Sequence, residues 1–130
     1  MEWRLEKRHK YYDWARIEMR YQYMRNLRKT DNIKGLAMCL RQDLVKNIGN
    51  ICHHKLFNKC HRGTKILIEN YHNEIIKCIK TLYNSQKLPP SLKLKFFAEA
   101  RHSYGQTALF LSGGGAFAKY HNGVVKALYE

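Results

Sequence analysis

The sequence predicts an α/β fragment: a mostly helical N-terminal arm that leads into the first strand, turn and helix of an α/β sheet. Apolar residues recur with a helical period over about the first 85 residues, two adjacent prolines follow, and an apolar run near the C-terminus ends in three glycines. We therefore divide the chain of 130 residues into a helical domain, 1–88, and the start of an α/β domain, 89–130.

The arm contains three predicted amphipathic helices, each indicated by apolar side chains at three- and four-residue steps. The apolar face of the first consists of Trp14, Ile17, Tyr21, Met24 and Leu27. The second begins after Thr30 and Asp31, a predicted N-cap, and ends at Gly49, a predicted C-cap. Its apolar face consists of Ile33, Leu36, Ala37, Leu40, Leu44 and Ile48.

The third predicted helix, residues 64–84, follows a loop at 51–63 in which we expect one short helix. Its apolar stripe consists of Leu67, Ile68, Tyr71, Ile75, Cys78, Ile79 and Leu82. Residues 86–90 end in Pro89 and Pro90 and cannot continue a helix, because proline lacks an N–H and restricts the residue before it. This segment is the predicted linker.

Ser91 is the predicted N-cap of a fourth helix, and Gly105 marks its C-terminus. An apolar strand from Ala108 to Leu111, the glycine turn and a last helix come next. A single apolar strand with exposed flanks would leave a row of backbone groups unpaired, which is costly. We therefore expect the rest of the sheet to lie beyond Glu130.

The charge of the chain predicts an acidic partner. Its formal net charge is +14, with 45% hydrophobic and 26% charged residues, as in a chain that folds. An anionic lipid surface and nucleic acid both fit, but Trp14, Tyr21 and Tyr71 lie on apolar stripes, which makes nucleic acid unlikely. No apolar stretch approaches the roughly 18 residues of a membrane span, and residues 1–8 are too charged for a signal peptide. We expect a cytoplasmic protein, with peripheral contact to a membrane or lipid droplet.

The four cysteines include no C-x-x-C pair, so the sequence predicts free thiols and no metal or cofactor. One cluster, Cys52-His53-His54 followed by Cys60-His61, is the weak candidate for a metal site.

The glycine turn, Gly113-Gly114-Gly115, predicts a site for an anion, because helix N-termini present N–H groups and a positive dipole end. A P-loop is excluded, since Ala116-Phe117-Ala118 follows where Gly-Lys-Ser or Gly-Lys-Thr is needed. A dinucleotide fingerprint is met only formally, without the ribose-binding acid. An oxyanion hole and a purely structural turn both remain open on chemistry alone.

The sequence around the turn resembles a known family. The motifs are Leu111-Ser-Gly-Gly-Gly-Ala-Phe-Ala-Lys-Tyr-His-Asn-Gly123, Tyr11-Tyr-Asp13, Leu40-Arg41-x-Asp-Leu-x-x-Asn47-x-Gly49-Asn-Ile51, Gly63-Thr64-Lys65-x-Leu-Ile-Glu69-x-Tyr71 and Phe96-Phe97-x-Glu-x-Arg101-His-x-Tyr-Gly105-x-Thr107. Together they resemble the patatin-like phospholipase family, in its triacylglycerol lipase branch, over roughly residues 11–130. Ala118 departs from the family, which usually has glycine there.

The resemblance implies acyl-ester hydrolysis in neutral lipid or phospholipid by a Ser-Asp dyad, with Gly113, Gly114 and Gly115 as the oxyanion hole. The nucleophile motif G-x-S-x-G and the partner Asp are absent from the sequence, and Ser112 is no substitute because it precedes the glycines. His121 is expected to be a packed residue rather than a base, and Gly123 to press its helix against a neighbour. We expect an N-terminal part of a lipase, inactive alone. The alternative is a non-catalytic basic module that binds anionic lipid or RNA.

Overall fold

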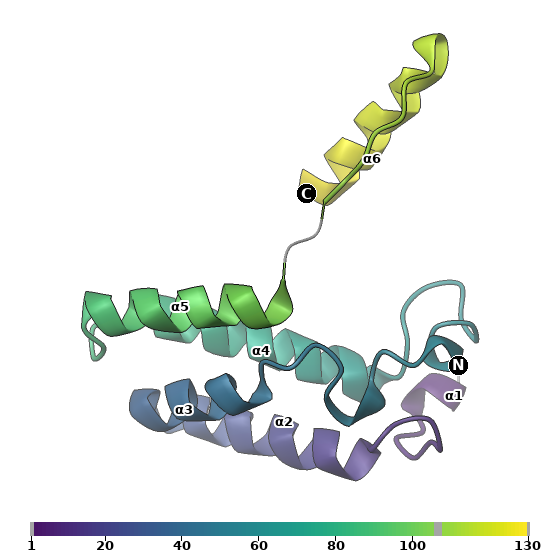
Figure 1. Ribbon diagram of the computed structural model, residues 1–130. Coiled ribbons are helices and arrows are strands. Elements are labelled where there is room, and N and C mark those ends of the chain that lie inside the picture. The colour runs from purple at the N-terminus through teal and green to yellow at the C-terminus, as the bar shows by residue number, and fades with distance from the viewer. Residues whose placement is uncertain (1, 106–107, 130) are drawn as a thin grey trace.

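A computed structural model describes residues 2–105 and 108–129, and its helices form a bundle followed by a separate C-terminal segment (Figure 1). The elements in chain order are α1 (Glu2–Leu5), α2 (Trp14–Lys29), α3 (Ile33–Asp43), the 3-10 turns η1 (Ile48–Asn50) and η2 (His54–Leu56), α4 (Ile66–Asn84), α5 (Pro90–Tyr104), η3 (Gly115–Ala118) and α6 (Lys119–Tyr129). In Figure 1 the teal helix α4 lies along α2, with α3 and α5 beside it, and α6 stands apart from the bundle.

The core of the bundle comes from the predicted apolar stripes. The most deeply buried residues of these stripes are Ile17, Met24, Leu36, Leu40, Ile68, Tyr71, Cys78 and Leu82, and Leu56 of η2, from outside them, is fully buried in the same cluster. Phe96 of α5 joins the same cluster with 4% of its surface exposed, so the helix after the predicted linker packs on the arm. Because Phe96 and the Arg41–Glu99 hydrogen bonds of 2.6 Å hold α5 on the bundle, helices α2 to α5 share one hydrophobic core.

Predicted helix boundaries are wrong in α3 and in α5. The N-cap of α3 is Asn32, whose side chain accepts from the N–H of Gly35 at 3.0 Å, and not Thr30 or Asp31. The second helix ends at Asp43 rather than at Gly49, although the apolar period continues through Leu44 and Ile48. Asp43 is buried and lies 3.4 Å from the Nε of Arg20, and Leu44 and Ile48 are buried from the segment that follows the helix. The two groups form an ion pair and not a hydrogen bond, because neither Nε of Arg20 nor Oδ1 of Asp43 has a hydrogen-bond partner among the described residues.

The misplaced boundary of α5 is its start. Pro89 occupies the N-cap position and Pro90 is the first helical residue, so Ser91 lies inside the first turn instead of capping it. Proline suits this place because its missing N–H would have no partner there. The predicted end is confirmed: Gly105 closes the helix with a φ of 74°.

A tight joint between η1 and the start of α2 explains two of the motifs. The N–H of Asp13 donates to the carbonyl of Gly49 at 2.8 Å, and the side-chain amide of Asn50 donates to the carbonyl of Tyr11 at 2.8 Å. Gly49 has a φ of 56°, and a Cβ added to it would meet Cδ1 of Ile17 at 3.2 Å. Glycine is therefore needed both for the backbone conformation and for the close approach of α2.

The N-terminus of α4 holds the short helix α1. Lys65, with none of its surface exposed, donates to the carbonyls of Trp3 at 2.6 Å and Glu6 at 2.9 Å. Arg4 forms a two-pronged bond to Glu69 at 2.7 and 2.8 Å. Burial lowers the pKa of Lys65, and the two carbonyl oxygens accept hydrogen bonds from its ammonium group in place of water.

A buried carboxylate joins α2 to α4. Glu74 is 3% exposed, and its two oxygens accept from Arg28 at 2.6 and 3.3 Å. The hydrogen bonds to Glu74 raise the pKa of Arg28, so the guanidinium stays charged. A paired charge in this position is tolerated, whereas an unpaired one would be strongly destabilising.

The predicted strand is wrong for this chain. Ala108 to Leu111 is extended but forms no strand, and none occurs among the residues that the structure describes; Thr107, which opens the apolar run, lies outside them. Phe110 is 91% exposed, so nothing covers this segment. A strand exists only through hydrogen bonds to a neighbouring strand, and the described residues supply no such neighbour.

Arg28→Met tests the buried ion pair. It keeps most of the aliphatic stem but leaves the Glu74 carboxylate buried without its partner, and we expect a loss of about 2 to 4 kcal/mol in the free energy of unfolding. Urea unfolding followed by circular dichroism measures this. Adding Glu74→Met should recover most of the loss, because it removes the unpaired charge. Lys80→Met, on the exposed side of α4, is the control, with a change within about 0.5 kcal/mol.

Gly49→Ala tests the joint. The methyl group adds strain at a positive φ and a contact with Ile17, and we expect a loss of about 1 to 3 kcal/mol in unfolding free energy. In the background of Ile17→Val, which lacks the contacting Cδ1 atom, the same change should cost less. An unchanged urea midpoint for Gly49→Ala would contradict the structure of this turn.

Candidate functional site

The three glycines form an open turn at the start of the C-terminal helix. Gly115 has a φ of 55° and begins η3, which runs directly into α6. A Cβ added to Gly113 or Gly115 would meet no atom within 4 Å. The N–H of Phe117 donates to the carbonyl of Gly114 at 3.1 Å, which makes the first turn of helix. The first backbone N–H groups of a helix have no acceptor within the helix, so those of this turn can donate to an anion.

A histidine from the helix braces this turn. Nε2 of His121, which is half-buried, lies 2.8 Å from the carbonyl oxygen of Ser112. The ring donates to a main-chain carbonyl, and this contact positions the turn but does not activate the serine hydroxyl. The structure thus brings His121 to the backbone of Ser112.

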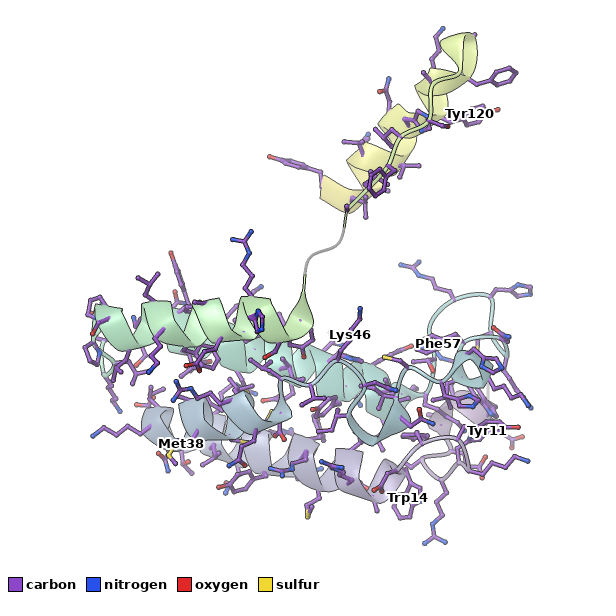
Figure 2. All side chains as sticks on the ribbon, in the orientation of Figure 1. Tyr11, Trp14, Met38, Lys46, Phe57 and Tyr120 are labelled. Carbon is purple, nitrogen blue, oxygen red and sulfur yellow. The ribbon has the colours of Figure 1, made fainter. Side chains whose placement is uncertain are left out.

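The apolar side chains around the turn are exposed. Phe110, Phe117, Tyr120 and Leu128 have 91%, 73%, 75% and 71% of their surface exposed. In Figure 2 Tyr120 lies on the segment that stands apart from the bundle. An oxyanion hole is effective only where water is excluded, and the turn alone has no such enclosure.

Gly123 corrects another prediction. A Cβ added there meets no atom within 4 Å, so the helix is not pressed against a neighbour at this position. The prediction fails because it assumed a strand under α6, and the described residues contain none. The glycine costs helix stability here without any packing in this chain to offset it.

The weak metal candidate has a different structure. Sγ of Cys52 donates to the carbonyl of Lys46 at 3.2 Å, and Nδ1 of His53 accepts from the N–H of Lys55 at 3.2 Å. Across the described part of the chain, no three His, Cys, Asp or Glu side chains are grouped to hold a metal ion. All four cysteines are unpaired, and burial raises the pKa of Cys39 and Cys78 to about 12, which keeps both thiols protonated.

The sequence analysis misses an aromatic stack in this region. The ring of Tyr11 stacks on His53 with centroids 4.6 Å apart and an angle of 6°, and His53 stacks on His54 at 4.7 Å. These residues come from segments about 40 positions apart in the sequence, so spacing could not reveal the stack. The signal available was a long stretch without acidic residues, 44–68, which contains both histidines.

None of the helices in residues 2–105 and 108–129 has the length and apolar character to cross a membrane.

Comparisons with known proteins point in one direction. The family model described as "Domain of unknown function (DUF3336)" matches residues 1–102. Triacylglycerol lipase ptl1 of Schizosaccharomyces pombe is 37% identical over 128 residues, which is 98% of this chain and 24% of that lipase. Triacylglycerol lipase SDP1L of Arabidopsis thaliana is 33% identical over 124 residues, 92% of this chain and 15% of that lipase. A patatin-like phospholipase domain-containing protein of Debaryomyces hansenii is 34% identical over 128 residues, 98% of this chain and 16% of that protein.

The chain spans about a quarter or less of the length of these relatives. An alignment that covers 98% of the chain includes the glycine turn, so the similarity is not confined to the helical bundle. No solved structure matches the chain.

Gly123→Ala tests whether α6 is unpacked in this chain. Because the added methyl group meets open space and alanine favours helix, we expect no loss of stability and a gain of about 1 kcal/mol in the local stability of α6. Amide hydrogen exchange of α6 should slow by about fivefold, which is the change that a stability gain of about 1 kcal/mol corresponds to. Faster exchange, or a lower urea midpoint, would show that the helix packs closely on a neighbour at this position.

Proposed function

The chain belongs to the DUF3336 family, the N-terminal domain of patatin-like triacylglycerol lipases, and from this premise we propose that it is the N-terminal part of a triacylglycerol lipase. The observation that carries the proposal is the open glycine turn at the head of a helix, in a segment that aligns with the lipases. The reaction is hydrolysis of an acyl ester in neutral lipid.

In this proposal Gly113, Gly114 and Gly115 form the oxyanion hole. A serine hydroxyl adds to the ester carbonyl as its proton passes to the partner Asp, and the negative charge that develops on the carbonyl oxygen is stabilised by backbone N–H groups of the turn. His121 holds the turn in shape through the carbonyl of Ser112 at 2.8 Å. The serine, in G-x-S-x-G, and its partner Asp belong to the remainder of the lipase, so these 130 residues are inactive alone.

The domain proposed from the sequence starts at residue 89 and so includes α5, which packs on the bundle. Within this domain, the segment at 108–129 is proposed to become the first strand and helix of the lipase sheet. Its exposed apolar side chains support this, because Phe110, Phe117 and Leu128 would be buried by neighbouring strands. Gly123 would then lie against the sheet, where the absence of a Cβ permits close packing.

The net charge of +14 supports a peripheral location, on a membrane or lipid droplet in the cytoplasm, where the lipid substrate is found. The same charge favours a second candidate function. A non-catalytic basic module that binds an anionic lipid surface or RNA needs no nucleophile, and G-x-S-x-G is absent from the 130 residues.

A chimera tests the lipase proposal. Residues 1–130 replace the aligned segment of the S. pombe lipase ptl1, to which they are 37% identical, and hydrolysis of triolein is measured. We expect an active chimera. Gly114→Pro, which removes one backbone N–H of the turn, should lower kcat by about a hundredfold or more.

Gly114→Ala is the matched control for the chimera. It keeps the N–H, its φ of 176° is open to any residue, and its Cβ would lie 3.5 Å from Phe117, an ordinary contact. We expect less than about a tenfold change in kcat for this variant. A folded chimera without activity, or equal losses for proline and alanine, would refute the assignment of the turn as an oxyanion hole.

A further inference from the structure

Positive charge is concentrated at the end of the bundle where the N-terminus meets the segment between α3 and α4. Between Asp43 and Glu69 the sequence contains five Lys or Arg and three His and no acidic residue. Figure 1 places the loop before α4 beside α1 and the N-terminal segment. We call this surface the basic end and define it as Arg8, Lys10, Tyr11, His53, His54, Lys55, Phe57, Lys59 and Arg62, which are exposed or half-buried.

The basic end is built around the ring of Tyr11. The ammonium groups of Lys10 and Lys55 lie 5.2 and 5.1 Å from the ring centroid, and they come from segments on opposite sides of α2 and α3 in the sequence. The ring is stacked on His53, and Asn50 holds the backbone of Tyr11 in place. The fold therefore holds in place the ring that both ammonium groups approach.

Two ionisable side chains of the basic end have lowered pKa values. Interaction with the Lys55 ammonium lowers the pKa of Tyr11, and burial together with the charges of His54 and Lys55 lowers the pKa of His53. Cations brought together in this way repel one another, and a bound anion would relieve the repulsion.

Three carboxylates, Glu6 in the N-terminal segment, Glu18 in α2 and Glu69 in α4, are engaged with other cations. Glu69 pairs with Arg4 at 2.7 Å, Glu6 lies 3.8 Å from Lys65, and Glu18 pairs with Lys7. These acidic groups therefore balance the charges of α1 and the N-terminal segment, and the positive potential of the basic end is left for a partner.

Aromatic geometry favours a lipid surface over RNA. Single-stranded RNA binds through bases stacked on open ring faces, but the ring of His53 already stacks on Tyr11 and on His54. Phe57, in contrast, is 46% exposed, and Figure 2 shows it at the same end of the molecule as Tyr11. An exposed apolar ring beside lysines and a tyrosine is the combination that enters the headgroup region of a bilayer.

We infer that the basic end is a docking surface for an anionic phospholipid membrane. The ammonium groups of Lys10 and Lys55, with the Tyr11 hydroxyl, take up a headgroup phosphate, while Phe57 enters the interface and Lys59 and Arg62 add electrostatic attraction. This assignment rests on the proposed function for the identity of the partner, a lipid surface, and it goes further by naming the residues that bind it.

Sedimentation of the 130-residue chain with vesicles tests the inference. The vesicles consist of phosphatidylcholine alone or with about a third phosphatidylserine, in salt from about 0.05 to 0.3 M. We expect binding only to the anionic vesicles. Lys10→Gln with Lys55→Gln should weaken it by about tenfold or more, and Phe57→Ser by about fivefold at the higher salt.

Lys77→Gln with Lys80→Gln is the matched control, since it removes the same charge from the exposed side of α4. It should weaken binding by less than about threefold. Circular dichroism shows whether each variant keeps its helix content, and Lys10→Arg with Lys55→Arg, which keeps the charge, should bind like the original chain.

Three results would overturn the inference: equal losses for the two lysine pairs, equal binding to neutral and anionic vesicles, or RNA that displaces the chain from vesicles and binds more tightly. None of these results bears on the glycine turn, because the chimera is assayed by hydrolysis. A chimera without activity combined with selective vesicle binding would leave the docking surface intact and refute the lipase assignment instead.

Discussion

The buried carboxylate of Glu74 determines how the bundle can pack. A charge that is 3% exposed is stable only if a cation meets it, and Arg28 on α2 is that cation at 2.6 Å. The pair fixes α2 relative to α4 both along and around the helix axes. Sequence periodicity provides apolar faces that would pack in several registers, whereas a two-pronged ion pair is compatible with one. The same helix binds α1 at its N-terminus through Lys65 and Glu69, so α4 holds elements from both ends of the bundle.

The joint at Gly49 fixes the position of the surface segment that precedes α2. Its carbonyl accepts from Asp13 and the neighbouring Asn50 donates to Tyr11, so the chain before α2 is tied to the segment after α3. The stack of Tyr11 on His53, and with it the approach of Lys10 and Lys55 to the same ring, therefore depends on a backbone turn at the edge of the core.

The sequence predicts the interior of the helices better than their ends. The apolar periods identify α2 and α4, and Gly105 correctly marks the end of α5, because each of these signals acts within a few residues. The end of α3 could not be found this way, since Leu44 and Ile48 continue the period while Asp43 meets Arg20 from another helix. The predicted strand at 108–111 is wrong for a related reason, because the hydrogen bonds of a strand depend on a neighbouring strand that the local sequence does not contain. The basic end was missed because its rings meet only after folding, and the assignment of the glycine turn as an oxyanion hole stays a prediction.

The two parts of the chain differ in what they can achieve alone. The bundle buries its apolar faces and pairs its buried charges, so its geometry is complete within residues 2–105. The turn at 113–115 has its local geometry from Gly115 and from the bond of His121 to Ser112, yet its apolar neighbours remain exposed. Local geometry places N–H groups where a charge would develop, but their strength depends on the exclusion of water. If the segment serves a lipase, the strands that cover Phe110 and Phe117 must therefore exclude water from the turn. The bundle's part is then to deliver this turn to a lipid surface.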